Sequence, residues 1–128
     1  MNRSVLLIED NEQNRYLVTF LLERSGYTVR AFADGARGID AAHNPIPAVI
    51  LLDIQLPTMD GYAVARALRK IAALSGVPIV AVTSYAMPGD REKALEAGCT
   101  GYIEKPINPE TFVAEVERVL SGAGKADP

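Results

Sequence analysis

The length, composition and charge of this chain indicate one ordinary globular domain. It has 128 residues, 48% hydrophobic and 23% charged, and domains of about 100–150 residues are common. Its 13 basic and 16 acidic residues give a formal net charge of −3, without the basic stripe typical of nucleic-acid-binding proteins. One cysteine excludes an internal disulfide, and no apolar run approaches the roughly 18 residues of a membrane helix. We expect a cytoplasmic protein that binds neither nucleic acid nor membranes.

Short apolar runs alternate with segments of helical length along the whole chain. The apolar runs are typical of buried strands, and the intervening segments carry apolar residues at helical spacing. In chain order, the pattern predicts a strand at 5–8, a helix at 11–24, a strand at 28–33, a helix at 34–43, a strand at 48–52, a helix from 60 to about 71, a strand at 78–82, a helix at 89–97, a strand at 101–104 and a helix at 109–120.

Five such alternations predict an α/β fold, in which a parallel sheet carries helices on both faces. Right-handed crossovers leave few topologies, and five strands favour the flavodoxin-like, doubly wound order 2-1-3-4-5 with five helices. We expect one domain over residues 1–120 and a short polar tail at 121–128.

Polar residues follow the predicted strands at their carboxyl ends, where doubly wound sheets bind ligands. Glu9 and Asp10 follow the first strand, Asp53 the third, Thr83 the fourth and Lys105 the fifth, so we expect them to meet. Two unit charges about 5 Å apart at an effective dielectric near 20 repel by roughly 3 kcal/mol. A hard divalent cation relieves such repulsion, and Mg²⁺ prefers carboxylate and water oxygens.

The chemistry that this arrangement favours is phosphoryl transfer to a carboxylate. Asp53 follows a fully apolar run and can act as a nucleophile toward phosphorus, which forms an aspartyl phosphate. Mg²⁺, the Thr83 hydroxyl and the Lys105 ammonium group would contact the phosphoryl oxygens. Every role in phosphoryl transfer is then filled except that of the donor.

Four segments carry a resemblance to a known family. They are Val-Leu-Leu-Ile-Glu9-Asp10-Asn11, Leu-Leu-Asp53-Ile-Gln-Leu-Pro57-Thr-Met-Asp60-Gly61, Val-Thr83-Ser84 and Lys105-Pro106. From Arg3 to about Leu120, the chain resembles the receiver domains of two-component response regulators, the CheY-like family. Each segment is unremarkable alone, and the specificity lies in their order and spacing.

The resemblance implies a role for each polar residue. Asp53 is the expected phosphoacceptor, and Thr83 and Lys105 are the residues expected to sense the phosphoryl group. The expected ligands of Mg²⁺, or of Mn²⁺ in its place, are Asp10, Asp53, the backbone carbonyl of Gln55 and, through water, Glu9.

The resemblance also implies a conformational switch. The Thr83 hydroxyl would move toward the phosphoryl group and Tyr102 would turn inward, which would repack the fourth helix, fifth strand and fifth helix and change partner binding. Tyr102 can instead be a half-buried aromatic of the sheet without a switching role. The Lys105–Pro106 bond is expected to be cis.

Several positions depart from the family pattern or have another explanation. Glu9 stands where aspartate is common, and Ser84 stands where alanine is frequent and would crowd access to Asp53. Gln55 and Tyr85 occupy positions that tune the lifetime of the phosphoryl group, in a direction that the sequence does not predict. Glu9 and Asp10 can alternatively cap the first helix.

The first predicted helix has more apolar residues than one buried stripe requires. These are Leu17, Val18, Phe20, Leu21 and Leu22. They either pack against the last helix or form a docking surface for the helical bundle that donates the phosphoryl group.

The sequence thus predicts a single-domain response regulator, because only eight residues follow the last predicted helix. It would accept a phosphoryl group from a histidine kinase or histidine phosphotransfer protein and would bind a downstream protein that the sequence does not identify. We expect a switch that assists its own phosphorylation and dephosphorylation rather than a conventional enzyme. The alternatives are a receiver cut from a hybrid histidine kinase, a pseudo-receiver, or a Mg²⁺-dependent phosphatase, which Gln55 disfavours because such enzymes need a second acid there.

Overall fold

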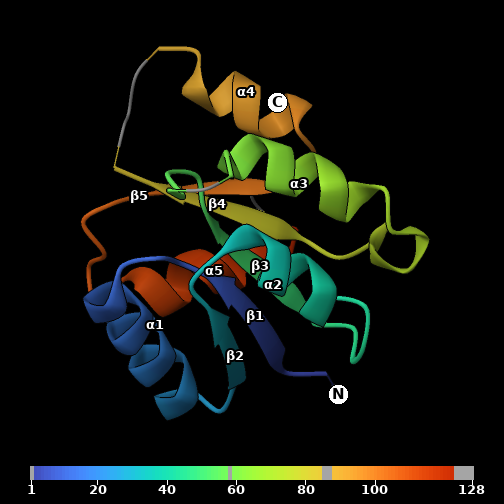
Figure 1. Cartoon of the computed structure of the whole chain (residues 1–128). Coiled ribbons are helices and arrows are strands. Elements are labelled where there is room, and N and C mark those ends of the chain that lie inside the picture. Colours follow the sequence, from blue (N-terminus) through green and yellow to red (C-terminus); the bar gives the residue numbers. More distant parts are fainter. Residues whose placement is uncertain (1, 58, 85–87, 123–128) are drawn as a thin grey trace.

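The structure, a computed structural model, describes residues 2–57, 59–84 and 88–122. Its elements are β1 (Ser4–Ile8), α1 (Glu12–Arg24), β2 (Thr28–Phe32), α2 (Gly35–Ala41), β3 (Val49–Asp53), α3 (Gly61–Arg69), a 3-10 helix (Ala72–Leu74), β4 (Ile79–Thr83), α4 (Asp90–Glu96), β5 (Gly101–Glu104) and α5 (Phe112–Leu120). All neighbouring strands pair in parallel, in the order β2-β1-β3-β4-β5 (Figure 1). The predicted fold and strand order are confirmed.

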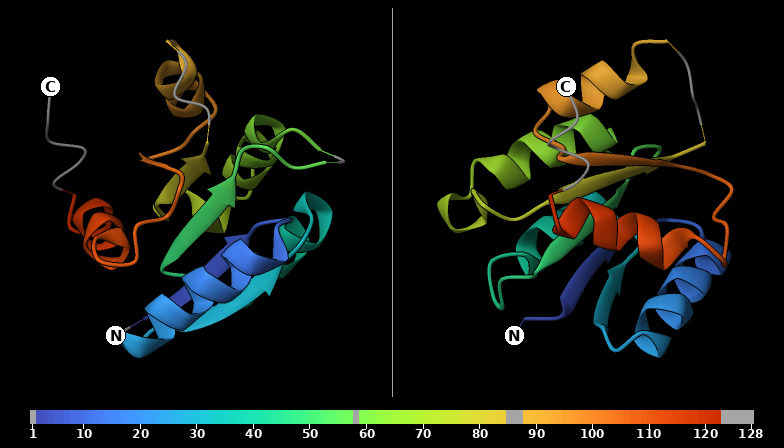
Figure 2. Two further views of the ribbon diagram at one scale, coloured as in Figure 1. Left: turned by 90° about the vertical axis from the view of Figure 1, so that its left-hand side faces the viewer. Right: turned by 180° about the vertical axis from the view of Figure 1, so that it is seen from behind.

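Helices cover both faces of the sheet because successive strand side chains point to opposite sides. Val5 and Leu7 of β1 pack toward α1 and α5, whereas Leu6 and Ile8 pack toward the side of α3 and α4. Figure 1 shows α2 and α3 in front of the sheet, and the right-hand view of Figure 2 shows α1 and α5 on the opposite face. β1, β3 and β4 are therefore sealed from water on both sides, which holds their carboxyl ends rigidly.

Asn11 begins α1, and this assignment overturns one alternative from the sequence. Its side-chain oxygen accepts a hydrogen bond from the Asn14 N–H at 2.8 Å, which makes Asn11 the N-cap. Glu9 and Asp10 therefore do not cap the first helix. Their carboxylates are left to form contacts at the carboxyl end of the sheet.

The last helix begins three residues later than expected. The side-chain oxygen of Asn108 accepts a hydrogen bond from the Glu110 N–H at 2.9 Å, and its carbonyl accepts from the N–H groups of Thr111 and Phe112. This side-chain turn takes up the segment that Pro109 was expected to start as a helix, so α5 runs from Phe112. The Lys105–Pro106 bond before it is cis, as expected, and so is Asn44–Pro45.

Gly61 brings the start of α3 back against the end of β3. Its N–H donates to the Ile54 carbonyl at 3.0 Å, and a Cβ atom at this position would lie 2.4 Å from the Ile54 Cα and 2.8 Å from the Asp53 carbonyl oxygen. The Asp60 side chain accepts from the Tyr62 N–H and caps α3. The short loop after Asp53 thus depends on a residue without a side chain.

Among the described residues, no helix is both long and apolar enough to cross a membrane.

Candidate functional site

Three carboxylates meet at the carboxyl ends of β1 and β3. Glu9, Asp10 and Asp53 each place a carboxylate oxygen within 4.8 Å of the others. The pairing of Ile8 in β1 with Leu52 in β3 brings the residues that follow them, Glu9 and Asp53, to the same edge of the sheet. Glu9 and Asp53 are each only 2% exposed, whereas Asp10 is exposed. The predicted convergence of these acids is present.

Lys105 is the cation that faces this cluster. Its Nζ lies 2.9 Å from Glu9 Oε1 and 3.5 Å from Asp53 Oδ2, so one ammonium group joins both buried carboxylates. The Lys105 N–H also donates to the Thr83 carbonyl at 2.8 Å, which holds the end of β5 beside that of β4. One lysine leaves three carboxylates incompletely neutralised when all are ionised.

Each buried carboxylate divides its two oxygens in the same way. One oxygen pairs with Lys105, and the other accepts a backbone N–H: Asp53 Oδ1 from Gln55 at 2.9 Å, and Glu9 Oε2 from Asn11 at 3.1 Å. In both cases the donor lies two residues further along the chain. The loops after β1 and β3 thereby fix the orientation of the carboxylates that they carry.

Arg15 is a contributor that sequence reasoning missed. Its Nη1 donates to the carbonyl oxygens of Glu9 and Asp10, at 2.9 and 3.0 Å, and so ties the loop after β1 to α1. The contact runs to backbone rather than to a carboxylate, and a charge pattern along the sequence does not reveal it.

Burial makes the ionised form of this cluster unfavourable. It raises the pKa of Asp53; the Gln55 N–H opposes that rise, and the neighbouring Glu9 adds to it. Burial and the proximity of Asp53 also raise the pKa of Asp10. Raised carboxylate pKa values destabilise the folded state at neutral pH, because the unfolded chain ionises more readily.

The donor set suits a hard divalent cation. Carboxylate oxygens this close together are typical Mg²⁺ ligands, and a cation between them would remove the repulsion that burial intensifies. Asp10, as the exposed member, is reachable from solvent, whereas Glu9 and Asp53 already hold Lys105. The residues present therefore fit the metal that the sequence predicted.

The remaining predicted residues that the structure describes lie on β4 and β5 or in the pocket that contains the acids. Thr83 ends β4 and is 2% exposed, and Tyr102 lies half-buried on β5, packed against the core beneath α3 and α4. Gln55 and Ser84 line the same pocket as the acids and Lys105. Tyr85, expected to tune phosphoryl lifetime, lies outside the described residues.

Comparisons with known proteins agree on one family. The sequence profile of the family described as "Response regulator receiver domain" matches residues 5–117. The polar-differentiation response regulator DivK of Brucella ovis is 39% identical over 123 residues, which span 96% of this chain and 100% of DivK.

Solved structures match over nearly the whole chain. Chemotaxis protein CheY4 of Vibrio cholerae superposes with a TM-score of 0.89 at 30% identity, covering 93% of this chain and 99% of CheY4. The receiver domain of sensor histidine kinase PA1611 from Pseudomonas aeruginosa PAO1 gives a TM-score of 0.82 at 35% identity, covering 98% of this chain and 100% of that domain. That structure holds a magnesium ion in its active site cleft.

Substituting Asp53 by asparagine should stabilise the metal-free protein, because it removes one of the crowded charges while keeping the shape of the side chain. Unit charges 4.8 Å apart at an effective dielectric near 20 repel by about 3 kcal/mol, a repulsion that Lys105 offsets in part. We expect Asp53→Asn to raise the free energy of unfolding at pH 7 by about 1 kcal/mol, measured by urea denaturation with a chelator present.

The pH dependence of stability tests independently whether the Asp53 charge destabilises the folded protein. The pKa of Asp53 in the folded protein is above its ordinary value of 3.8, so the folded protein still holds this proton at a pH where the unfolded chain has lost it. The advantage of Asp53→Asn should therefore be absent below pH 3.8 and grow as pH rises. Mg²⁺ should stabilise the wild type and the exposed control Asp40→Asn more than Asp53→Asn. A less stable Asp53→Asn protein at pH 7 would contradict this electrostatic interpretation.

Proposed function

This chain belongs to the response regulator receiver domain family, and we propose on that basis that it is a phosphorylation switch with Asp53 as its phosphoacceptor. The observation that carries the proposal is the shared contact of Lys105 with Glu9 and Asp53 inside a cluster of three acids. A stable fold has no need of this arrangement, whereas phosphoryl transfer requires both its cation and its carboxylates.

The local geometry prepares Asp53 to attack phosphorus. The Gln55 N–H holds Oδ1 and Lys105 approaches Oδ2, so the carboxylate is oriented before a donor arrives. In the transfer, an Asp53 oxygen forms a bond to phosphorus, the bond between phosphorus and the donor nitrogen breaks, and its electron pair leaves with the donor histidine. Lys105 would then pair with a phosphoryl oxygen and Thr83 would donate its hydroxyl to another.

Glu9, Asp10 and Asp53, with the backbone carbonyl of Gln55, are the residues that would hold the metal. Mg²⁺, or Mn²⁺ in its place, would neutralise part of the negative charge that the carboxylates and an incoming phosphoryl group bring to this site. Lys105 lies closer to Glu9, at 2.9 Å, than to Asp53, at 3.5 Å, which supports a role through water for Glu9 rather than direct ligation. Gln55 stands where a phosphatase of related fold would need a second acid, so turnover of external substrates is not favoured.

The output surface that we propose is formed by α4, β5 and α5. A pocket between these elements is lined by Arg91 and Leu95 of α4, Tyr102 of β5, and Arg118 and Val119 of α5. Tyr102 thus reaches both the core and this surface, which supports a switching role. A change at Thr83 would be passed to a downstream protein through this pocket.

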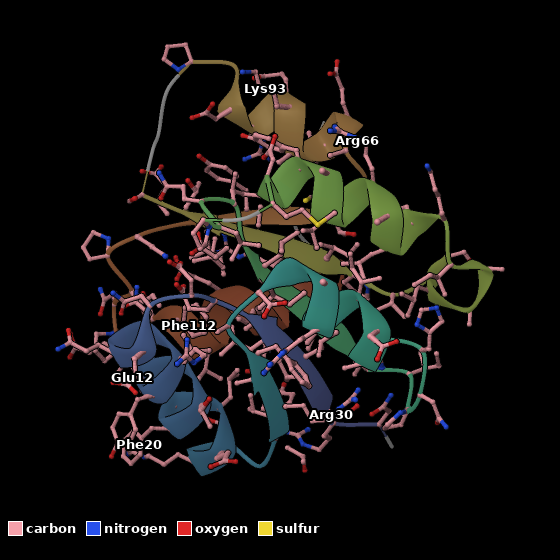
Figure 3. The ribbon with its side chains drawn as sticks, viewed as in Figure 1. Glu12, Phe20, Arg30, Arg66, Lys93 and Phe112 are labelled. Carbon is pink, nitrogen blue, oxygen red and sulfur yellow. The ribbon has the colours of Figure 1, made fainter. Side chains whose placement is uncertain are left out.

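The donor surface that we propose is the outer face of α1. Val18, Leu21 and Leu22 are buried, but Tyr16 and Phe20 are 74% and 47% exposed, with their rings stacked 6.4 Å apart. Figure 3 shows Phe20 pointing away from the sheet. The burial of Val18, Leu21 and Leu22 supports packing against the last helix, whereas the exposure of Phe20 supports a docking role for the outer face. A histidine kinase or histidine phosphotransfer protein docked on this face would lie beside the acidic pocket, because α1 begins at its rim.

Labelling with a small phosphodonor tests the acceptor. Incubation with radiolabelled acetyl phosphate and Mg²⁺ should label the wild type and the exposed control Asp40→Asn. Asp53→Asn should lose nearly all label, because it replaces the acceptor carboxylate that Lys105 and the Gln55 N–H hold. Equal labelling of Asp53→Asn and wild type would overturn the assignment.

Comparing a protein phosphodonor with a small-molecule phosphodonor tests the docking face. With a phosphorylated histidine phosphotransfer domain that labels the wild type, Phe20→Ala should slow transfer about tenfold, since exposed aromatic residues dominate many protein interfaces. Labelling by acetyl phosphate should not change, and neither reaction should change in Leu95→Ala, which removes an equally exposed apolar side chain from α4. Slowing by Phe20→Ala with both donors would show a structural defect instead.

A further inference from the structure

Gln55 and Ser84 join two loops across the mouth of the acidic pocket. Gln55 lies two residues after Asp53, and Ser84 directly follows Thr83 at the end of β4. The Ser84 hydroxyl donates to Gln55 Oε1 at 2.6 Å, and the Ser84 N–H points at the same oxygen from 3.5 Å. Both residues line the pocket that contains Asp53 and Lys105.

This contact fixes which end of the Gln55 carboxamide faces Ser84. A backbone N–H can only donate, so the atom that it approaches must be the oxygen and not the nitrogen. The backbone of Gln55 is fixed too, because its N–H donates to Asp53 Oδ1 at 2.9 Å. The backbone and the side-chain oxygen of Gln55 are therefore both held, and the group that Ser84 leaves available is the NH₂, which only donates.

The orientation of this amide bears on how an aspartyl phosphate at Asp53 would hydrolyse. A water oxygen forms a bond to phosphorus, the bond from phosphorus to the Asp53 oxygen breaks, and its electron pair returns to the carboxylate. One water hydrogen stays on the attacking oxygen and the other passes to a phosphoryl oxygen, which yields dihydrogen phosphate. A neighbouring amide oxygen assists by accepting a hydrogen bond from the water and turning its lone pair toward phosphorus. An NH₂ group would instead bind that lone pair.

We infer that Ser84 is a positioning residue that withholds the Gln55 side-chain oxygen from attacking water and so lengthens the lifetime of the phosphoryl group. The inference rests on the proposed function of Asp53 as acceptor and gives Gln55 a direction of effect that the sequence did not predict. Removing the hydroxyl frees Oε1 to turn toward the water, so the group decays faster. This differs from steric crowding by Ser84, which would act whatever residue stands at position 55.

A double-mutant cycle separates these two explanations. Wild type, Ser84→Ala, Gln55→Met and the double variant would be labelled with radiolabelled acetyl phosphate and Mg²⁺, freed of donor, and followed for loss of label. We expect Ser84→Ala to decay about threefold to tenfold faster, the range for loss of one hydrogen bond, and to have no effect in the Gln55→Met background. Ser84→Thr keeps the hydroxyl and should keep the wild-type rate; the exposed control Ser75→Ala should too.

The possible results are distinct. A Ser84→Ala decay equal to or slower than wild type would overturn the inference, and so would an equal acceleration in the Gln55→Met background, which would indicate crowding. Fast decay in Ser84→Thr would also contradict it. Failure of the wild type to take up label would contradict the proposed function itself, whereas normal labelling with unchanged decay would contradict only the role of Ser84.

Discussion

Crowding of negative charge at one edge of the sheet is the constraint on which the structure of the site depends. Glu9 and Asp53 are buried, Asp10 adjoins them, and Lys105 supplies the one cation in contact with both buried acids among the described residues. Such a cluster opposes folding, since desolvation raises the pKa of both aspartates. The proposed function explains why such a cluster persists, because that function requires a site for a divalent cation and a phosphoryl group.

The rest of the fold holds that unfavourable cluster in place. β1 and β3 are buried on both faces, so the ends of these strands have little freedom to relax and separate the charges. Backbone amides of Asn11 and Gln55, together with the arginine at position 15, fix the loops that follow. Gly61 keeps the second of these loops short. The packing of the sheet and the orientation of the buried carboxylates are thus linked through the backbone contacts of these two loops.

The sequence predicted the sheet order and the meeting of Glu9, Asp10, Asp53 and Lys105 because both follow from strand periodicity and topology. Apolar runs locate the strands, and a parallel sheet places their carboxyl ends on one edge. Side-chain hydrogen bonds between segments carry no such pattern. The contact of Arg15 with the loop after β1 and the Ser84–Gln55 bridge depend on distances that only the folded chain defines. The turn at Asn108 that delays α5 is local, and there the side-chain turn competed with the helix start expected at Pro109.

Chemical identification of the modified residue tests the central claim most directly. The wild-type chain would be treated with acetyl phosphate in Mg²⁺ or in a chelator, reduced with borohydride to convert an acyl phosphate to an alcohol, and sequenced by mass spectrometry. We expect the alcohol at position 53 alone, and only where Mg²⁺ was present. Modification at another carboxylate, or an equal yield in the chelator, would contradict a cation-dependent acceptor built on Asp53.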